Sequence, residues 1–600
     1  MTPPPDGRGP ADHVERRDRR RRAAALVCAA AGALALTSAV LPPARGRLAD
    51  LLALTPFAVP ATAAGLTALV GCLLLVLARG LRRGSRLAWG GSVVALAAVA
   101  VLHVVKGLDV EEALVTAAAL AWLATQGRAF PVRASRAALA RAAGLAVLGT
   151  LAALALSAGL AVGYGGHQHA RDLDESVEQA AARLVGVEQA QAAGVPVGLV
   201  PGVGPASARV LPLAGAGLAT SALWLALAPP RARALTPQER RRERERAREV
   251  VRRHGGDTLA YFALRDDKDW YFTGSTVVAH AVRGDTCLVS PDPVGPPEEL
   301  AAAWADFRAY AERNGWTVVV VGAAPDALDV YRGSGMHAVY LGDEAILDCQ
   351  TFSLAGRHMK SLRQAVGRVG RAGITTTFTS PGTIDPALRA ELVAMSGQSR
   401  RGEAERGFSM TLSRLADPAD DDLLLAVARD AAQQVVGFVQ WVPAAGIDGW
   451  SLDVMRRRTD ADLPNGVVDA MVVATAEHLR ERGQRGLGLN FAVLRTVVSG
   501  EAEGRLPGAA RALLTRLGGH AQVESLWRFN AKYDPAWRPR YVVVDSLAAL
   551  AGDGLAVARA EGVVGELPVV GSLAPVRTAA SRLRSRAHHV PEGSAGHRAP

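Results

Sequence analysis

A chain of 600 residues is long enough for several domains, and its 49% hydrophobic content and positive mean hydropathy exclude a wholly soluble protein of ordinary composition. The formal net charge of +11 predicts an anionic partner, either a membrane surface or a nucleic acid. The four cysteines are scattered and the histidines form no metal-binding motif, so we expect no disulfide framework, no metal and no cofactor.

The N-terminal third alternates between basic and apolar segments. Residues 1–22 form a basic tail that we expect to be disordered, and apolar runs follow over residues 23–230. Most of these runs approach the ~20 residues that cross a bilayer as a helix, which predicts a six-helix transmembrane region rather than a signal peptide. The runs lie at 23–41, 55–78, 87–105, 108–125, 142–163 and 208–228.

Arginines in alternate loops predict the orientation of these spans. They cluster before the first span, at 79–86, at 128–141 and from 231 onward, whereas the loop at 164–207 carries acidic residues. The positive-inside rule therefore places both termini in the cytosol. Residues 231–254 then form a charged juxtamembrane helix, which either lies against anionic headgroups or is a solvated connector.

Residues 255–565 alternate strand-like and helix-like segments twice, which predicts two successive α/β units with a cleft at their junction. We assign 255–372 to a first half, 373–565 to a second, catalytic half, and 566–600 to a basic, disordered tail. The first half is expected to have strands at 259–264, 270–273, 277–282, 286–289, 316–321 and 340–347, with helices at 298–314 and 325–333. The second is expected to have helices at 385–397, 466–482 and 507–517, and strands at 408–412, 422–428, 434–441, 449–455, 486–493 and up to 544.

Two stretches of the second half combine buried apolar residues with polar ones, and we expect them to form two walls of one pocket. The stretch 450–469 reads as a buried strand, a Pro-Asn-Gly turn and a helix N-terminus, an arrangement that suits a phosphate or an oxyanion. In the stretch 524–541, polar and apolar residues alternate with a period of two, which predicts one set facing a core and the other a cleft.

The segment 357–371 between the halves has a basic stripe. At 100° per residue its five cations fall within an arc of about 140°, opposite Leu362, Val366 and Val369. Such a stripe suits phosphate or tRNA binding, although a solvated helix face has the same pattern. The cations are Arg357, Lys360, Arg363, Arg368 and Arg371.

Several motifs in one order over about 300 residues resemble the lysylphosphatidylglycerol synthases (phosphatidylglycerol lysyltransferases, the multiple peptide resistance factors). The motifs are Ser361-Leu-Arg-Gln-Ala, Ser451-Leu-Asp-Val-Met-Arg-Arg, Pro464-Asn-Gly, Leu489-Asn-Phe-Ala-Val-Leu-Arg and Glu524-Ser-Leu-Trp-Arg-Phe-Asn-Ala-Lys-Tyr.

The resemblance implies tandem GNAT-like acyltransferase folds on a membrane region. It also implies transfer of an aminoacyl group, lysyl in the family, from aminoacyl-tRNA to the glycerol hydroxyl of phosphatidylglycerol. Full-length relatives carry additional spans that flip the product, and some carry a fused lysyl-tRNA synthetase. Six spans suggest a synthase without flipping, and the chain's end at residue 600 suggests that charged tRNA comes from elsewhere. The amino acid transferred and the oligomeric state, a homo-oligomer included, stay open.

Aminoacyl transfer needs orientation, a proton acceptor and oxyanion stabilisation. We expect Asp453 to handle the proton or bind the α-amine, and Arg456 to bind a phosphate or the oxyanion. Lys532, like Arg528, suits the lipid phosphate or the tRNA terminus. Asp469 reads as a helix N-terminal residue. The candidate substrate-binding residues are Arg528, Asn530 and Asn490, with Glu405 and Glu524 as partners for a lysyl ammonium. Each could instead form a structural ion pair or hydrogen bond.

Two other classes of protein stay open. An acyl-CoA-dependent GNAT acetyltransferase would need a glycine-rich pyrophosphate loop after the central strand, and residues 456–466 lack those glycines. A non-catalytic membrane sensor or lipid-binding protein would tolerate the loss of Asp453 and Lys532.

Overall fold

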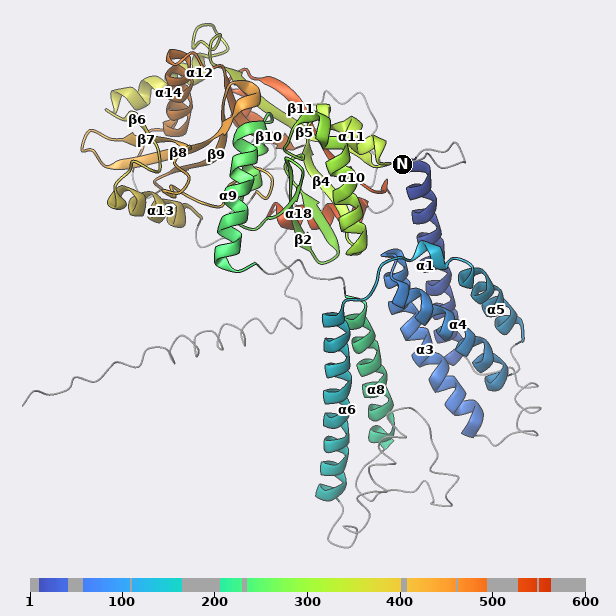
Figure 1. Ribbon diagram of the computed structural model, residues 1–600. Coiled ribbons are helices and arrows are strands. Elements are labelled where there is room, and N and C mark those ends of the chain that lie inside the picture. Colours follow the sequence, from blue (N-terminus) through green and yellow to red (C-terminus); the bar gives the residue numbers. More distant parts are fainter. Residues whose placement is uncertain are drawn as a thin grey trace, which may run out of the picture.

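The computed structural model describes two parts, a bundle of apolar helices and a domain built on one large sheet (Figure 1). The described residues are 10–40, 58–107, 110–164, 205–228, 235–400, 407–459, 462–493, 527–547 and 550–562. The predictions for the loop 165–204, the helix 507–517 and the tail 566–600 lie outside them, as do Glu405 and Glu524.

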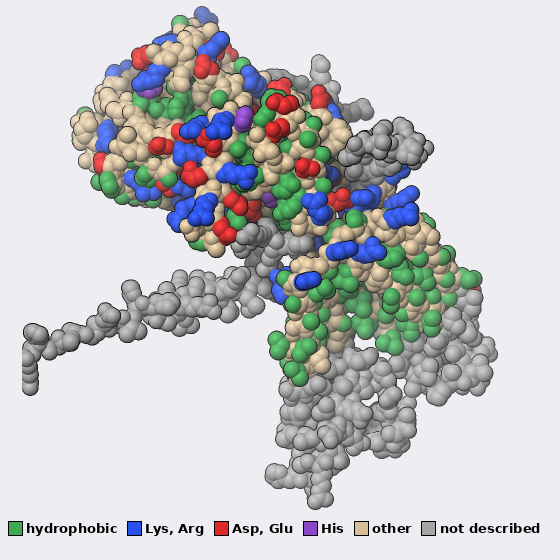
Figure 2. Space-filling model, viewed as in Figure 1, with side chains coloured by type: hydrophobic (Ala, Val, Ile, Leu, Met, Phe, Trp, Pro, Cys, Tyr) green, Lys and Arg blue, Asp and Glu red, His purple; other side chains and the backbone are tan. Residues whose placement is uncertain are grey.

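Each of the six predicted apolar runs lies on a helix. Two segments of the described residues, Arg19–Ser38 and Arg86–His103, are long and apolar enough to cross a membrane. Hydrophobic side chains cover the outside of this part (Figure 2), including Leu26, Val94 and Leu148, which are 71%, 70% and 68% exposed. The helices are α1 (Pro10–Val40), α3 (Ala58–Arg82), α4 (Arg86–Gly107), α5 (Val110–Ala124), α6 (Arg136–Tyr164) and α8 (Pro205–Ala226), with a 3-10 turn η1 (Gly127–Ala129).

Two details of this part differ from the sequence-based expectation. The basic segment expected to be a disordered tail is helical from Pro10 onward, because it continues directly into the apolar run of α1. Helix α5 has 15 residues and is about 22 Å long at 1.5 Å per residue, short of a ~30 Å hydrocarbon core. The six-span arrangement therefore stays a prediction.

The second part is built on one sheet of 11 strands in the order β1-β2-β3-β4-β11-β5-β10-β9-β8-β7-β6. Its strands agree with most of the predicted ones, since β-branched apolar runs bounded by turns are the pattern of buried strands. They are β1 (Asp269–Thr273), β2 (Thr276–Arg283), β3 (Thr286–Val289), β4 (Thr317–Ala323), β5 (His337–Asp348), β6 (Thr375–Thr379), β7 (Leu424–Arg429), β8 (Val435–Ala444), β9 (Gly449–Arg457), β10 (Gly486–Val493) and β11 (Ala536–Val544).

One arrangement occurs twice in this sheet. An antiparallel series, β1-β2-β3 or β6-β7-β8-β9, is followed by a helix and then by a strand parallel to the last of the series, β4 or β10. The last strand, β11, does not stay with the second half. It inserts between β4 and β5 and is antiparallel to both.

Helices cover both faces of the sheet (Figure 1). Buried residues of α12 and α14 form the largest core cluster with β7–β10, whereas α13 packs with Phe438 and Val454 in another cluster. Helices α10 and α11 pack on β2–β4 around Trp304 and Phe307. The bounds are α10 (Pro297–Arg313), η4 (Pro325–Ala327), α11 (Leu328–Gly333), α12 (Lys360–Arg371), α13 (Pro386–Arg400), η5 (Ala445–Ile447), α14 (Val467–Glu481) and α18 (Leu550–Ala560).

Helix α9 (Pro237–His254) joins the two halves. Arg240 pairs with Asp269 of β1 at 2.9 Å. One turn on, Arg244 pairs with the fully buried Asp420 at 2.8 Å, on the loop before β7. The sequence offered headgroup binding or a solvated connector for this helix. The structure shows that its inner arginines are occupied by both halves of the sheet.

The helical part is attached to the first half by ion pairs. Arg83, in the turn directly after α3, donates through Nε and Nη2 to Asp285 in the β2–β3 turn, at 2.9 and 2.6 Å. Arg17 and Arg21 of α1 both contact Glu312 near the end of α10, at 2.6 and 2.9 Å. Burial alone would raise the pKa of Asp285, but Arg83 lowers it overall. The arginines read as positive-inside signals thus also hold the sheet domain.

Two predicted strands are not strands. Residues Ala260–Leu264 form a 3-10 helix, η3, and all of them are buried. The prediction of a strand was wrong because a short apolar run without alternation fits a buried helical segment as well as a buried strand. Residues 408–412 form turns, with Gly407 at φ 97°.

Candidate functional site

The residues that the sequence placed in the first pocket wall lie near the point where the ladder between the parallel strands β9 and β10 ends. They pair over three residues each, Gly449–Ser451 with Gly486–Gly488, although β9 continues to Arg457. On its other edge β9 pairs with β8 along its length, with a register shift near Leu452. Asp453 and Arg456 therefore lie just beyond the last β9–β10 pair, at the strand end that the sequence indicated.

Asp453 is 4% exposed and is held by two donors. Its Oδ1 accepts the backbone N–H of Leu412 at 2.7 Å, and its Oδ2 accepts Nε2 of Gln440 at 2.6 Å. Gln440 is fully buried and also binds Arg414 O and the N–H of Ala416. The carboxylate therefore fixes the loop 407–416 against the sheet, and it lies close to the end of the β9–β10 ladder.

The Pro-Asn-Gly turn leads into α14 as predicted. Gly466 has φ 109°, and a Cβ there would lie 2.7 Å from the Cβ of Ala365 on α12, so only glycine fits without displacement. Arg368 of α12 donates to Asn465 O at 3.3 Å. Arg456 donates through Nη1 to Met455 O at 2.8 Å. The helix N-terminus is thus bordered by the basic helix.

The stretch around Lys532 is not the alternating strand that the sequence predicted. Residues 527–531 are helical, so Asn530 and Tyr533, three residues apart, are buried, whereas Arg528 is exposed. Lys532 pairs with Asp469 at 3.0 Å, and the Tyr533 hydroxyl donates to the same carboxylate at 2.8 Å. Burial, followed by the charge of Asp469, raises the pKa of Tyr533.

Asp469 therefore pairs with Lys532 and Tyr533 from the first turn of α14, whose N-cap residue makes no side-chain cap. Asp453 and Lys532 belong to two different hydrogen-bonded clusters. Asn490 lies on β10, and its side chain is outside the described residues.

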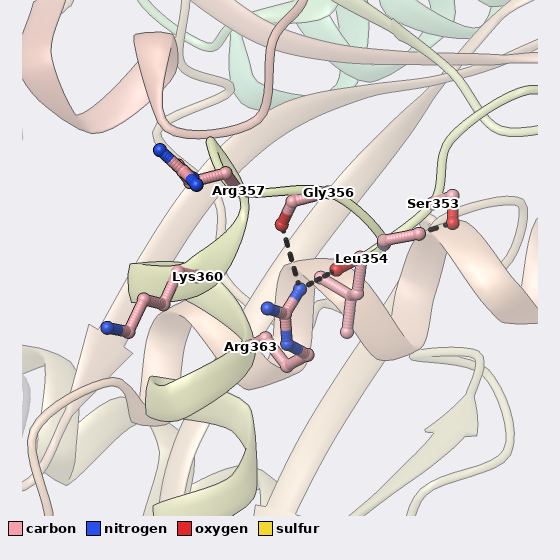
Figure 3. Close-up of a pocket in the computed structure, with 7 residues that line it drawn as sticks. Ser353, Leu354, Gly356, Arg357, Lys360 and Arg363 are labelled. Atoms are coloured by element: carbon pink, nitrogen blue, oxygen red, sulfur yellow. Dashed lines mark hydrogen bonds between the residues drawn. The ribbon is translucent and has the colours of Figure 1, made fainter.

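Four of the five cations of the basic stripe lie on helix α12, whereas Arg357 lies in the segment before it. All five cations are exposed, whereas Leu362, Ala365 and Val369 are buried. Arg357, Lys360 and Arg363 line a shallow pocket of about 640 Å³ with the loop 353–356 (Figure 3). Arg363 turns toward this loop and donates to Leu354 O and Gly356 O, whereas Arg357 and Lys360 extend away from it (Figure 3). Arg363 therefore has a structural role, whereas the side chains of Arg357 and Lys360 make no hydrogen bond or ion pair with other described residues.

A buried ionic network between β5 and β11 was not singled out by the sequence. Arg540 binds Oε2 of Glu344 through Nε and Nη2, at 3.0 and 2.6 Å, and both oxygens of Asp257, at 2.7 and 3.0 Å. Burial would lower the pKa of Arg540, but Asp257 and Glu344 raise it overall. The one signal was an acidic pair, Asp343 and Glu344, inside an otherwise apolar strand.

Fold and site together define a chain with an apolar helical region and a double α/β domain, in which a central ladder ends beside buried polar residues. Residues 248–544 match the family model described as phosphatidylglycerol lysyltransferase, C-terminal. This segment belongs to that family, and the resemblance read from the motifs is confirmed.

Curated relatives of the chain are named for lysylphosphatidylglycerol biosynthesis. The lysylphosphatidylglycerol biosynthesis bifunctional protein LysX of Rhodococcus opacus is 39% identical over 316 residues, which are 51% of this chain and 28% of the relative. LysX of Mycobacterium tuberculosis is 38% identical over 311 residues, 51% of this chain and 26% of the relative. The match therefore spans less than a third of the length of these relatives.

Two solved structures, named as a lysylphosphatidylglycerol synthetase or by the abbreviation L-PGS, are similar to about half of the chain. L-PGS from Bacillus licheniformis is 23% identical, with a TM-score of 0.48, over 53% of this chain and 96% of that one. The C-terminal domain of a putative lysylphosphatidylglycerol synthetase from Agrobacterium fabrum is 24% identical, with a TM-score of 0.46, over 55% of this chain and 100% of that one.

Proposed function

We propose that the protein is a membrane-bound transferase that moves an aminoacyl group, lysyl by family, from aminoacyl-tRNA to the glycerol hydroxyl of phosphatidylglycerol. The observation that carries this proposal is the match of residues 248–544 to the phosphatidylglycerol lysyltransferase family, at 38–39% identity to the LysX proteins. The sheet domain would consist of two GNAT-like halves, in keeping with the repeated strand–helix–strand arrangement.

The reaction is a transesterification. A glycerol oxygen attacks the ester carbonyl, a new C–O bond forms, the bond to the tRNA ribose oxygen breaks, and the hydroxyl proton ends on that ribose oxygen. The ester is already activated, so no metal or redox cofactor is needed for the balance. The protein's task is to align the two substrates and stabilise the oxyanion.

In this proposal Asp453 acts at the end of the β9–β10 ladder, where Leu412 and Gln440 orient its carboxylate for proton handling or for the α-amine. Arg456, further along the same strand, binds a phosphate or the oxyanion. Lys532 would have to leave Asp469 to reach substrate, and its side chain is 41% exposed, so water can solvate it during this exchange. Arg528, Asn530, Asn490, Glu405 and Glu524 are kept as proposed substrate-binding residues.

The six N-terminal helices would form the membrane region, with the sheet domain in the cytosol, where aminoacyl-tRNA is found. Apolar exteriors on these helices and arginines at the ends that touch the sheet domain support this orientation. A reporter fused after Val250 should be active only in the cytosol. Activity on the outer face would overturn the orientation and the tRNA substrate with it.

The product would change the charge of the membrane. Phosphatidylglycerol carries one negative charge, and a lysyl ester adds two ammonium groups, so the lipid becomes a net cation. Each basic residue near an anionic surface gains about 1 kcal/mol, so a less negative surface attracts polybasic peptides less. Resistance to cationic antimicrobial peptides is the expected physiological result.

The direct test is to express the full chain in a host without aminoacyl lipids and to analyse the extracted lipids by mass spectrometry. A new phosphatidylglycerol species heavier by one aminoacyl residue is expected, and its mass identifies the amino acid. In membranes supplied with charged tRNA, ribonuclease treatment should stop its formation. An expressed protein that yields no such lipid would refute the proposal.

Site variants test the assigned residues. Asp453→Asn and Lys532→Ala should each abolish the lipid product while the protein still inserts and folds. A variant that retains full product levels returns that residue to a purely structural role.

A further inference from the structure

Two buried oxygen atoms beside the ladder's end have no hydrogen-bond partner among the described residues. They are Oε1 of Glu344 on β5 and Oγ of Ser451 on β9, and both residues have no exposed surface. Buried polar atoms in folded proteins are nearly always paired, because an unpaired one carries its full desolvation cost. Two such atoms near one another indicate a donor that binds there.

Both atoms lie on the same side of β10. Gly488 pairs with Ile346 of β5 and with Ser451 of β9. A Cβ at Gly488 would lie 3.2 Å from Ser451 Oγ and 3.5 Å from Glu344 Oε1, so the glycine leaves both oxygens uncovered by a side chain. This is also the last residue of β10 that pairs with β9, so the oxygens stand where the two strands begin to separate.

The charge around Glu344 is not balanced. Arg540 is shared between two carboxylates, those of Glu344 and Asp257, which gives the three side chains a formal charge of −1. Arg540 occupies Oε2 of Glu344 only, so the uncompensated charge faces the side where Ser451 lies. Buried charge of this kind calls for a cation with hydrogen-bond donors.

We infer that Glu344 and Ser451 form a subsite for a primary ammonium group of the aminoacyl substrate. An ammonium offers three donors and one positive charge, which matches one carboxylate oxygen, one hydroxyl oxygen and the unbalanced charge. A metal ion fits less well, because the described residues contain no group of three or more metal-ligating side chains. This inference rests on the proposed function, whose substrates carry an α-ammonium and, for lysine, an ε-ammonium.

The subsite differs from the residues that the sequence suggested for ammonium binding, Glu405 and Glu524. It places the amine at the junction of the two halves, since β5 and β11 belong to the first half's sheet and β9 and β10 to the second. Binding of the aminoacyl end would thus depend on both halves.

The experiment measures binding of lysinamide to the full chain in detergent, by calorimetry and by the shift in melting temperature. Ser451→Ala removes a hydroxyl that has no partner, so the protein without ligand should be at least as stable as wild type. Its affinity for lysinamide should fall roughly tenfold, the effect of one hydrogen bond to a charged group. Glu344→Gln should weaken binding more, about 10- to 100-fold.

Asp257→Asn is the matched control, because it removes the same charge from the other side of the Arg540 guanidinium. It should weaken binding less than Glu344→Gln. Equal losses of lysinamide affinity in these two variants would mean that Glu344, Asp257 and Arg540 only support the fold, and this would overturn the subsite. Unchanged lysinamide affinity in Ser451→Ala, or no binding to wild type, would overturn the subsite.

Two analogues identify which amine is bound. Norleucinamide keeps the α-amine and lacks the ε-amine, whereas Nα-acetyl-lysinamide has the reverse. The analogue whose affinity falls in Ser451→Ala carries the bound ammonium, and a fall for neither overturns the inference.

Lipid analysis of the same proteins separates the two proposals. Wild type that makes aminoacyl lipid, with variants that bind lysinamide normally, refutes the subsite alone. Wild type that makes no such lipid, with Ser451→Ala and Glu344→Gln weakened for lysinamide, refutes the function and leaves the ammonium site in place.

Discussion

The basic stripe, made of Arg357 and the exposed cations of α12, allows a quantitative test of tRNA binding. The double variant Arg357→Gln, Lys360→Gln removes two exposed cations whose side chains make no hydrogen bond or ion pair with other described residues. Each lost phosphate contact lowers the slope of log affinity against log salt by about 0.7–0.9, so the pair should lower it by about 1.4–1.8. Relative to 1 M salt, affinity at ~0.15 M would fall roughly 14- to 30-fold.

The assay is the apparent KM for aminoacyl-tRNA over a salt series, with the full chain in lipid vesicles. The maximal rate should change little, because uniform binding rather than a transition-state contact is removed. Arg241→Gln, Arg242→Gln is the control, since it removes two exposed charges from α9 and leaves α12 intact. Its salt slope should stay at the wild-type value.

An unchanged slope in the α12 variant, or an equal change in the α9 control, would refute tRNA binding by this face. If α12 instead holds the domain on anionic lipid, the variant keeps its KM for tRNA and loses its response to the anionic-lipid content of the vesicles.

Three further predictions concern stability. Reversing one partner of the Arg83–Asp285 pair should destabilise the attachment of the sheet domain by about 1 kcal/mol, and Arg83→Asp with Asp285→Arg together should restore it in a melting experiment. Gly466→Ala should lower the melting temperature, because its φ is 109° and its Cβ would meet Ala365 at 2.7 Å; a neutral result would show that α12 can shift. Burial, followed by neighbouring carboxylates, raises the pKa of Asp553 to about 7. The stability that its protonated form contributes is therefore full below the ordinary carboxyl pKa and lost as pH rises through about 7. In Asp553→Asn, melting should fall less between about pH 5 and pH 8 than in wild type, and parallel curves would contradict this.

The sequence predicted most of the sheet because many of its strands are β-branched apolar runs bounded by turn residues, as in β3 and β4. It also predicted the α12 stripe, since helical periodicity places the cations opposite Leu362 and Val369. These features depend on local pattern alone.

The remaining features depend on contacts between distant segments. Alternation from Trp527 to Tyr533 looks like a strand, but Asn530 and Tyr533 are buried on one side of a helical turn. Glu344 and Arg540 lie 196 residues apart in the sequence, so neither marks a site by itself. No local sequence pattern predicts that Arg540 becomes the partner of Glu344, because β11 inserts between two strands of the first half.

The position of β11 also has a consequence for synthesis of the protein on the ribosome. Strands β4 and β5 are not neighbours. Strand β4 pairs with β3 on one edge, but its other edge and the edge of β5 that faces it lack a partner until β11 pairs with both. Residues 349–535 must be translated first, which takes roughly 10–40 s at about 5–20 residues per second. During that interval the nascent first half has two open strand edges, a known aggregation hazard. A fragment that ends before Ala536 should keep those edges open permanently, so the first half should not fold as an isolated product.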